Sequence, residues 1–109
     1  MTWKFLPQMQ NFNYETYQVW NSVFRYSAPN RVDVWATLVS TEKPEARQAR
    51  VAQLIEEEAR KAIFEGCENA HARFLLRGLL AGVEWHKIAE NYMDDVNDVL
   101  FQDHLESVK

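Results

Sequence analysis

The sequence contains very few of the groups on which disulfides, redox chemistry or catalysis depend. Its 109 residues include a single cysteine, Cys67, so the chain cannot form an internal disulfide, and one thiol is compatible with a reducing compartment. It has no glycine-rich phosphate-binding loop and no Ser, His and Asp in a known catalytic order. These absences predict a protein without a cofactor, a bound metal, a catalytic site or a small-molecule substrate.

Long apolar runs are also missing. The longest uncharged apolar run, Leu79 to Val83, is far shorter than the roughly 18 residues that cross a bilayer. Pro7 and four amide side chains occupy the first 13 residues, where a signal peptide would need an apolar core. We therefore expect a soluble cytoplasmic protein that makes no contact with a membrane.

An excess of basic residues is missing as well. The net charge is −4 and the sequence pI is near 5.3, so the attraction that dominates nucleic-acid binding is absent and we predict no nucleic-acid partner. The whole imbalance lies in residues 94–109, which contain one basic and five acidic residues. We expect a short acidic helix after Met93, with Val96, Val99 and Leu100 on its inner side.

The length and the apolar content fit one domain over 1–109 with a single hydrophobic core. The most apolar segment, 69–93, has hydrophobic residues over most of a helical circumference and should be the buried central helix. Gly78 and Gly82 lie within it, although each costs about 1 kcal/mol relative to Ala in a helix. Both fall on one face, where another backbone can approach closely. We therefore predict Gly78, Gly82 and Trp85 as helix-packing positions.

A second helix precedes this segment. Pro44 suits a first helical turn and Gly66 suits a C-terminal cap, so we expect a helix over about 44–65. Its predicted inner face consists of Ala52, Ile55, Ala59, Ala62 and Ile63, and Val51 and Leu54 flank this face. Because only about three residues connect this helix to 69–93, the two should form an antiparallel helical hairpin, and the fold should be mainly α.

The segment before the hairpin allows two interpretations. Asn13 is a good helix N-cap, and apolar residues at helical spacing indicate a helix over 14–27 that ends before Pro29. A further helix would have one face made of Val32, Trp35 and Val39. The many β-branched and aromatic residues also fit a β-hairpin at about 16–39. We favour the two helices.

Aromatic residues are concentrated early in the sequence, since eight of the fourteen lie within the first 26 residues. Residues 1–13 show neither helical nor strand periodicity, yet they are too aromatic for an ordinary disordered tail. We expect an extended arm that lies over the chain's own core or over a neighbouring subunit. Because aromatic side chains dominate the buried centres of interfaces, the predicted interface residues are Trp3, Phe5, Phe12, Tyr17, Trp20 and Phe24.

A few residues carry a chemical alternative. Cys67 stands four residues before His71 near the start of the predicted central helix, where a helix N-terminus favours a thiolate. Glu68 and His71 form a Glu-x-x-His pair of the kind found in di-iron bundles, although those bundles need two such pairs. No third orienting group accompanies the thiol. An inert cysteine and a solvated helix start explain these residues better.

Two further sets of residues have a plain explanation beside a chemical one. His86, Glu90 and Asp94 could approach one metal ion if the central helix continues that far, but a solvated helix edge is the commoner cause of such spacing. Arg73 and Arg77 could form an anion clamp. We expect them instead to make ion pairs within the chain, with Glu68 and Glu84 as partners.

The run from Arg73 to Trp85, behind a Glu-rich helix that contains Ala59, resembles the closing helical hairpin of short proteins encoded among tailed-phage structural and assembly genes. The resemblance extends from roughly Ala46 to Ile88. It implies an accessory part in virion assembly or in the virion itself, located in the host cytoplasm or in the particle. It brings no catalytic residue with it.

These observations together favour a non-enzymatic module for protein–protein interaction or assembly, which acts on a protein partner or as a homo-oligomer. One alternative is a small acidic inhibitor or adaptor that places residues 94–106 in a basic site of a host enzyme. A thiol- or metal-dependent enzyme is the remaining alternative.

Overall fold

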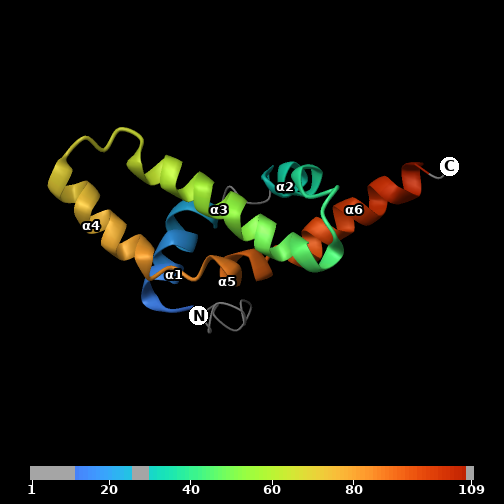
Figure 1. Cartoon of the computed structure of the whole chain (residues 1–109), viewed down its shortest axis with the longest axis horizontal. Coiled ribbons are helices and arrows are strands. Elements are labelled where there is room, and N and C mark those ends of the chain that lie inside the picture. The colour runs from blue at the N-terminus through green and yellow to red at the C-terminus, as the bar shows by residue number, and fades with distance from the viewer. Residues whose placement is uncertain (1–11, 26–29, 108–109) are drawn as a thin grey trace.

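The computed structural model describes residues 12–25 and 30–107. Within these ranges the chain is mainly helical and has no strand, which confirms the mainly α prediction and contradicts the alternative β-hairpin over 16–39. In chain order the elements are α1 (Tyr14–Val19), η3 (Trp20–Phe24), α2 (Val32–Leu38), η5 (Pro44–Ala46), α3 (Arg47–Phe64), α4 (Ala70–Ala81), α5 (Trp85–Glu90) and α6 (Met93–Ser107) (Figure 1).

The first helix begins where the sequence predicts it. The Asn13 side chain accepts a hydrogen bond from the Thr16 amide at 2.8 Å and so caps the N-terminus of α1. α1 continues into η3, a turn of π-helix in which the Arg25 amide donates to the Trp20 carbonyl at 2.9 Å. The last residues of the predicted helix over 14–27 lie outside the described ranges.

The helical hairpin is present, but its second arm is made of two helices. α3 ends at Phe64, and Gly66 turns the chain with a φ of +80°, the left-handed conformation that favours glycine after a helix. The chain then returns through α4 and α5, and α5 packs against α3 (Figure 1). The predicted continuous helix over 69–93 is therefore wrong, because the chain leaves helical geometry between α4 and α5 and again before α6.

Hydrogen bonds to the start of the first helix explain the break between α4 and α5. The Asn13 Nδ2 donates to the Gly82 carbonyl, and the Glu84 amide donates to the buried Thr16 hydroxyl, each at 2.8 Å. A Cβ on Gly82 would lie 3.2 Å from the Cδ of Glu15, so the glycine permits the close approach of α1. Gly82 is thus a packing position, at a corner of the chain instead of inside a helix.

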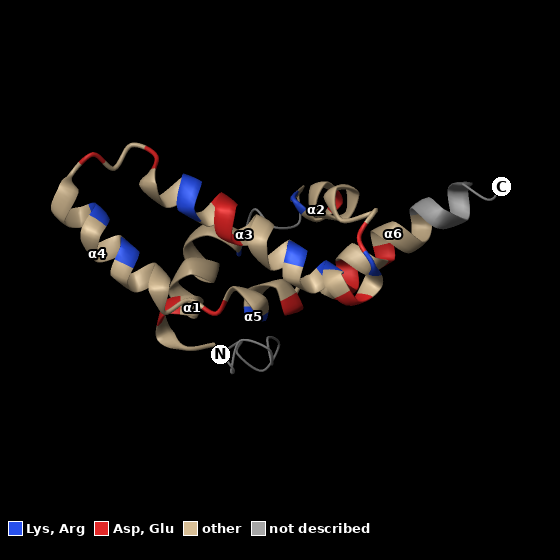
Figure 2. Cartoon of the chain, in the orientation of Figure 1, with Lys and Arg blue, Asp and Glu red and all other residues tan. Residues whose placement is uncertain are grey.

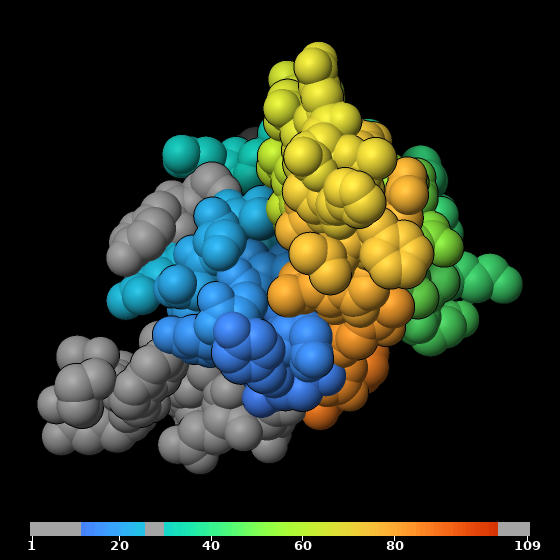
Figure 3. Space-filling view, turned by 90° about the vertical axis from the view of Figure 1, so that its left-hand side faces the viewer, coloured from blue at the N-terminus to red at the C-terminus, as the bar shows by residue number. Residues whose placement is uncertain are grey.

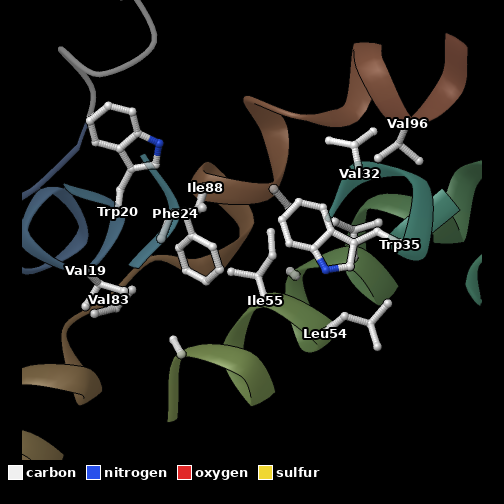
Figure 4. Close-up of a cluster of buried hydrophobic side chains, with 14 of the residues drawn as sticks. Val19, Trp20, Phe24, Val32, Trp35, Leu54, Ile55, Val83, Ile88 and Val96 are labelled. Atoms are coloured by element: carbon white, nitrogen blue, oxygen red, sulfur yellow. The ribbon is translucent and has the colours of Figure 1, made fainter. Parts of the chain in front are cut away.

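The core is formed by side chains from α1, η3, α2, α3, the end of α4, α5 and the start of α6 (Figure 4). Phe24 and Trp35 are fully buried and meet edge to face, with their ring centroids 6.2 Å apart. The ring centroid of Tyr92 lies 5.6 Å from that of Trp35, and the Tyr92 hydroxyl accepts a hydrogen bond from Trp20 Nε1 at 2.8 Å. Two predicted interface residues, Trp20 and Phe24, are therefore core residues, because rings of the same chain cover them.

The inner faces of the other helices follow the hydrophobic pattern over most of their length. The buried residues of α3 are Val51, Ala52, Leu54, Ile55 and Ala59, and those of the second predicted face are Val32, Trp35 and Val39. Ala62 is exposed and Ile63 is half-buried, because the C-terminal end of α3 extends past the core. Trp85 is half-buried and packs against the core, and Val96 of α6 is fully buried.

α4 is not the buried central helix that the sequence predicts. Leu80 is the only buried residue of α4, all of which is described. No atom of the described chain lies within 4 Å of where a Cβ on Gly78 would be, so the predicted close approach at Gly78 is not made there. A search of the described helices finds none that combines the length and the apolar character needed to cross a membrane.

Candidate protein interface

Figure 3 shows α1 and α4 side by side at one end of the molecule, and three exposed large apolar residues lie on these two helices. In the described part of the chain, the exposed large hydrophobic residues are Tyr14, Val34, Leu38, Phe74, Leu75 and Phe101. Phe74 and Leu75 are the most exposed of them, at 74% and 72%, and Tyr14 follows at 69%. Single exposed apolar residues need no explanation. Tyr14, Phe74 and Leu75, however, lie on two neighbouring helices, and a cluster of exposed apolar residues is typical of a contact surface.

The exposed side of α4 presents two large apolar residues. Phe74, Leu75 and Gly78 share this side, because residues three and four positions apart lie on one face of a helix. Leu76 and Leu80 lie on the opposite side, toward the chain. Gly78 leaves a position without a side chain next to two large apolar ones, so a partner helix could approach closely. We refer to Phe74, Leu75 and Gly78 as the α4 face.

An open apolar groove adjoins the α4 face. Its volume is about 240 Å³, and it is lined by Tyr14, Gln18, Val19, Ser22, Ile63, Leu76 and Leu79. The groove therefore runs between α4, the first helix and the end of α3. Leu75 and Leu79 stand four positions apart on α4 and connect the α4 face with this groove. A partner that covers the α4 face can place an apolar side chain here.

α4 is held at both ends, although its outer side is uncovered. At its start the Asn69 side chain accepts a hydrogen bond from the Ala72 amide at 3.0 Å. Arg73 Nη1 donates to the Phe64 carbonyl at 3.2 Å and to the Cys67 carbonyl at 2.6 Å, which ties α4 to the end of α3. At the end of α4, the hydrogen bonds from Asn13 to the Gly82 carbonyl and from the Glu84 amide to Thr16 fix the turn that follows. The outer side is therefore presented by a positioned helix.

The two arginines of α4 do not make the ion pairs that the sequence predicts. The Arg73 guanidinium lies 5.0 Å from the centroid of the Phe64 ring, and that of Arg77 lies 6.0 Å from the same ring. Glu84 pairs with Lys87 at 3.4 Å instead. Arg73 contacts carbonyl oxygens and an aromatic face, and among the described residues no carboxylate lies within ion-pair distance of it.

Charge is distributed unevenly over the molecule. α4 contains two arginines and no acidic residue, whereas residues 93–102 of α6 contain three acidic residues and no lysine or arginine (Figure 2). The Arg77 side chain is exposed beside the α4 face. This end of the molecule is consequently apolar with a basic edge, which suits a partner that is apolar and acidic.

The candidate chemical groups are not brought together. Cys67 is half-buried, and its backbone carbonyl, not its thiol, meets Arg73, while His71 is exposed on the first turn of α4. The predicted approach of His86 and Glu90 to Asp94 requires one helix, but α5 ends at Glu90 and a new helix begins at Met93. In the described ranges, no group of three or more His, Cys, Asp and Glu residues is placed to hold a metal ion.

The predicted aromatic interface residues have different positions. Trp3 and Phe5, with most of the predicted arm over 1–13, lie outside the described residues. Phe12 and Tyr17 are half-buried, and their rings contact Trp20 at centroid distances of 6.4 and 6.1 Å. Tyr14, which was not among the predicted residues, is the exposed aromatic residue of α1.

Sequence reasoning missed the α4 face because it placed every apolar residue of 69–93 in the core. The sequence did contain an indication of this face. A helix that packs on one side needs a single apolar stripe, and the consecutive apolar residues Phe74, Leu75 and Leu76 extend beyond such a stripe. In comparisons with known proteins, no family model, no curated protein and no solved structure matches the chain.

Proposed function

We propose that this chain is a non-enzymatic protein–protein interaction module of a larger assembly, and that the α4 face is the surface by which it binds. The observation that carries the proposal is the exposure of Phe74 and Leu75, at 74% and 72%, on a helix whose two ends are fixed. Burying each side chain in an interface would contribute about 1.5–3 kcal/mol. Such exposure is costly to solubility, so a role in contact explains it better than chance.

The neighbouring features support the same function. The groove beside Tyr14 and Leu79 can receive a partner side chain, and Gly78 allows a second helix to come close. Centres of interfaces are apolar and aromatic, and their rims are polar. The α4 face with Arg77 at its edge has this composition. We propose a phage particle as the first assembly in which to look for the partner.

The test compares a double variant, Phe74→Ser with Leu75→Ser, with a matched control, Val34→Ser with Leu38→Ser. The control also changes two exposed apolar residues, at 37% and 51% exposure, but on α2. Both variants should keep the circular dichroism and melting temperature of the wild-type chain, because all four residues are exposed.

In light scattering and in pull-down with the full chain, only the α4 variant should lose its oligomers or its partner. The expected loss is at least about tenfold in affinity, since aromatic side chains that become buried at the centre of an interface are typical hot spots. Equal behaviour of wild type, α4 variant and control in both assays would show that the α4 face binds nothing.

The prediction for Trp3 and Phe5 can be examined in the same assays. Deleting residues 1–11 leaves Asn13 and its cap in place. If the arm contributes to binding, the truncated chain should bind less tightly than wild type while it unfolds at the same temperature. Unchanged binding would remove the arm from the interface.

A further inference from the structure

Another exposed aromatic side chain, that of Phe101, lies on α6, at the end of the molecule opposite to α4 (Figure 1). Phe101 is 59% exposed there, on the same side of α6 as Asp94 and Asp98, which precede it by seven and three positions. All three side chains face solvent. We refer to Asp94, Asp98 and Phe101 as the α6 face.

The two faces complement each other in charge as well as in apolar character. The α4 face offers two large apolar side chains and the exposed Arg77, and the α6 face offers an aromatic ring and two carboxylates. Among the described residues, neither Arg77 nor Asp98 has an ion-pair partner. Because the faces lie at opposite ends, they cannot meet within one chain (Figure 1).

A groove beside Asp98 would receive the basic residue. It has a volume of about 320 Å³, and its lining residues are Val32, Asp33, Asp95, Asp98 and Val99. Three of these five residues are acidic and two are valines. An arginine fits such a place, because its aliphatic stem can pack on the valines while the guanidinium meets the carboxylates.

We propose that α4 of one copy of this chain docks antiparallel on α6 of a second copy, with Phe74 and Leu75 against Phe101 and Arg77 against Asp98. The register follows from the sequence: when Phe74 faces Phe101 in an antiparallel pair, the residue three positions after Phe74 faces the residue three positions before Phe101. Gly78 lets the two helices approach. This inference rests on the proposed function and names the partner of the α4 face.

Such a contact joins two different surfaces, so a pair of copies keeps one free α4 and one free α6. Contacts of this kind produce closed rings or open chains and do not stop at symmetric dimers. One pair of short helical faces is a small interface, so association is weak and depends on concentration. The ion pairs make it weaker at high salt.

Sedimentation velocity on the full chain tests the contact by complementation. Wild type should grow into larger species between about 1 μM and about 1 mM, the range of weak protein association. Phe74→Asp blocks α4, Phe101→Asp blocks α6, and each variant alone should associate at least about tenfold more weakly. Mixed together they retain one intact α4 and one intact α6, and should form dimers that do not grow further.

Charge reversal supplies a second arm of the experiment. Arg77→Glu and Asp98→Arg should each weaken association, and the chain that carries both should recover it, because the pair is restored with its signs exchanged. Leu38→Asp, an exposed apolar position outside both faces, is the matched control and should associate like wild type. Unchanged melting temperatures show that the variants fold.

The outcomes separate this inference from the proposed function. A mixture of Phe74→Asp and Phe101→Asp chains that stays monomeric, or a Phe101→Asp chain that associates like wild type, overturns the pairing of α4 with α6. Wild type that stays monomeric over the whole range also overturns it. The proposed function still stands in each of these cases if the α4 double variant loses a different protein partner.

Discussion

Replacing Glu58 with alanine should destabilise the chain, because it removes the hydrogen-bond acceptor of the buried Trp35 indole. One oxygen of the Glu58 carboxylate, Oε1, accepts from the indole Nε1 of Trp35 and from the Arg31 Nε, each at 3.0 Å. The Arg31 Nη2 donates to the same oxygen. Trp35 is fully buried in the intact chain, and Glu58 is the acceptor of its indole N–H.

The magnitude follows from the exposure of each partner. A buried donor left without an acceptor costs about 1–3 kcal/mol. The Arg31–Glu58 ion pair adds little, at most about 1 kcal/mol, because the two side chains are 40% and 28% exposed and solvent screens them. Glu58→Ala should therefore cost about 1–4 kcal/mol in all. Arg31→Ala, which leaves the Trp35 bond intact, should cost at most about 1 kcal/mol.

Urea unfolding followed by tryptophan fluorescence and by circular dichroism measures both variants. The midpoint should fall while the dependence of unfolding free energy on urea stays constant, which identifies a change in stability alone. Glu58→Gln, which keeps an acceptor for the indole, should recover part of the loss. The reasoning is refuted if Glu58→Ala and Arg31→Ala cost the same, because the buried indole N–H would then contribute nothing.

Two further predictions concern single residues of the fold. Burial raises the pKa of Tyr92 above its ordinary value of 10.0, and the hydrogen bond from Trp20 opposes this shift in part, so the folded chain holds the phenol proton more tightly than the unfolded chain. This contribution is complete below the unfolded pKa and is lost as pH rises through the folded one, so Tyr92→Phe should lose less stability than wild type above pH ~10 in urea titrations; parallel losses would contradict the assignment. Gly66→Ala should cost about 1 kcal/mol because of its φ of +80°, and Gly66→Asn less, in thermal melts; a neutral alanine would show that the turn can relax.

The hairpin and its first arm could be predicted because the information is local. α3 has one apolar stripe, a proline in the turn before it and a glycine after it, and each acts within a few residues of itself. Glu56 and Arg60, four positions apart on α3, form an ion pair at 2.8 Å of the kind that such spacing favours. The Asn13 cap was predictable for the same reason, since it bonds three residues away.

The broken second arm could not be predicted, because its cause is distant in the chain. The bonds that end α4 join Asn13 to Gly82 and Thr16 to Glu84, across 69 and 68 positions. Hydrophobic periodicity also cannot tell a residue that faces the core from one that faces a partner. Periodicity placed Phe74 inside the chain, and the enrichment of aromatic residues at interfaces placed Trp20 at one, whereas the structure exposes Phe74 and buries Trp20.

Gly78 is the residue at which stability and function should separate. It lies inside α4 and nothing occupies the space around its missing side chain, so Gly78→Ala should stabilise the isolated chain by about 0.5–1 kcal/mol through helix propensity. The same change at Gly82 should gain less, because the new Cβ would lie 3.2 Å from the Glu15 Cδ.

If a partner helix approaches α4 closely, the added methyl group at Gly78 lies in its path. The variant should then melt at a higher temperature and yet associate more weakly in sedimentation velocity at equal concentration. A variant that is both more stable and unimpaired in binding would mean that the glycine serves no contact. The helix-propensity cost of Gly78 would then have no compensation, and close packing of a partner on α4 would be ruled out. The exposure of Phe74 and Leu75 would still need its own explanation.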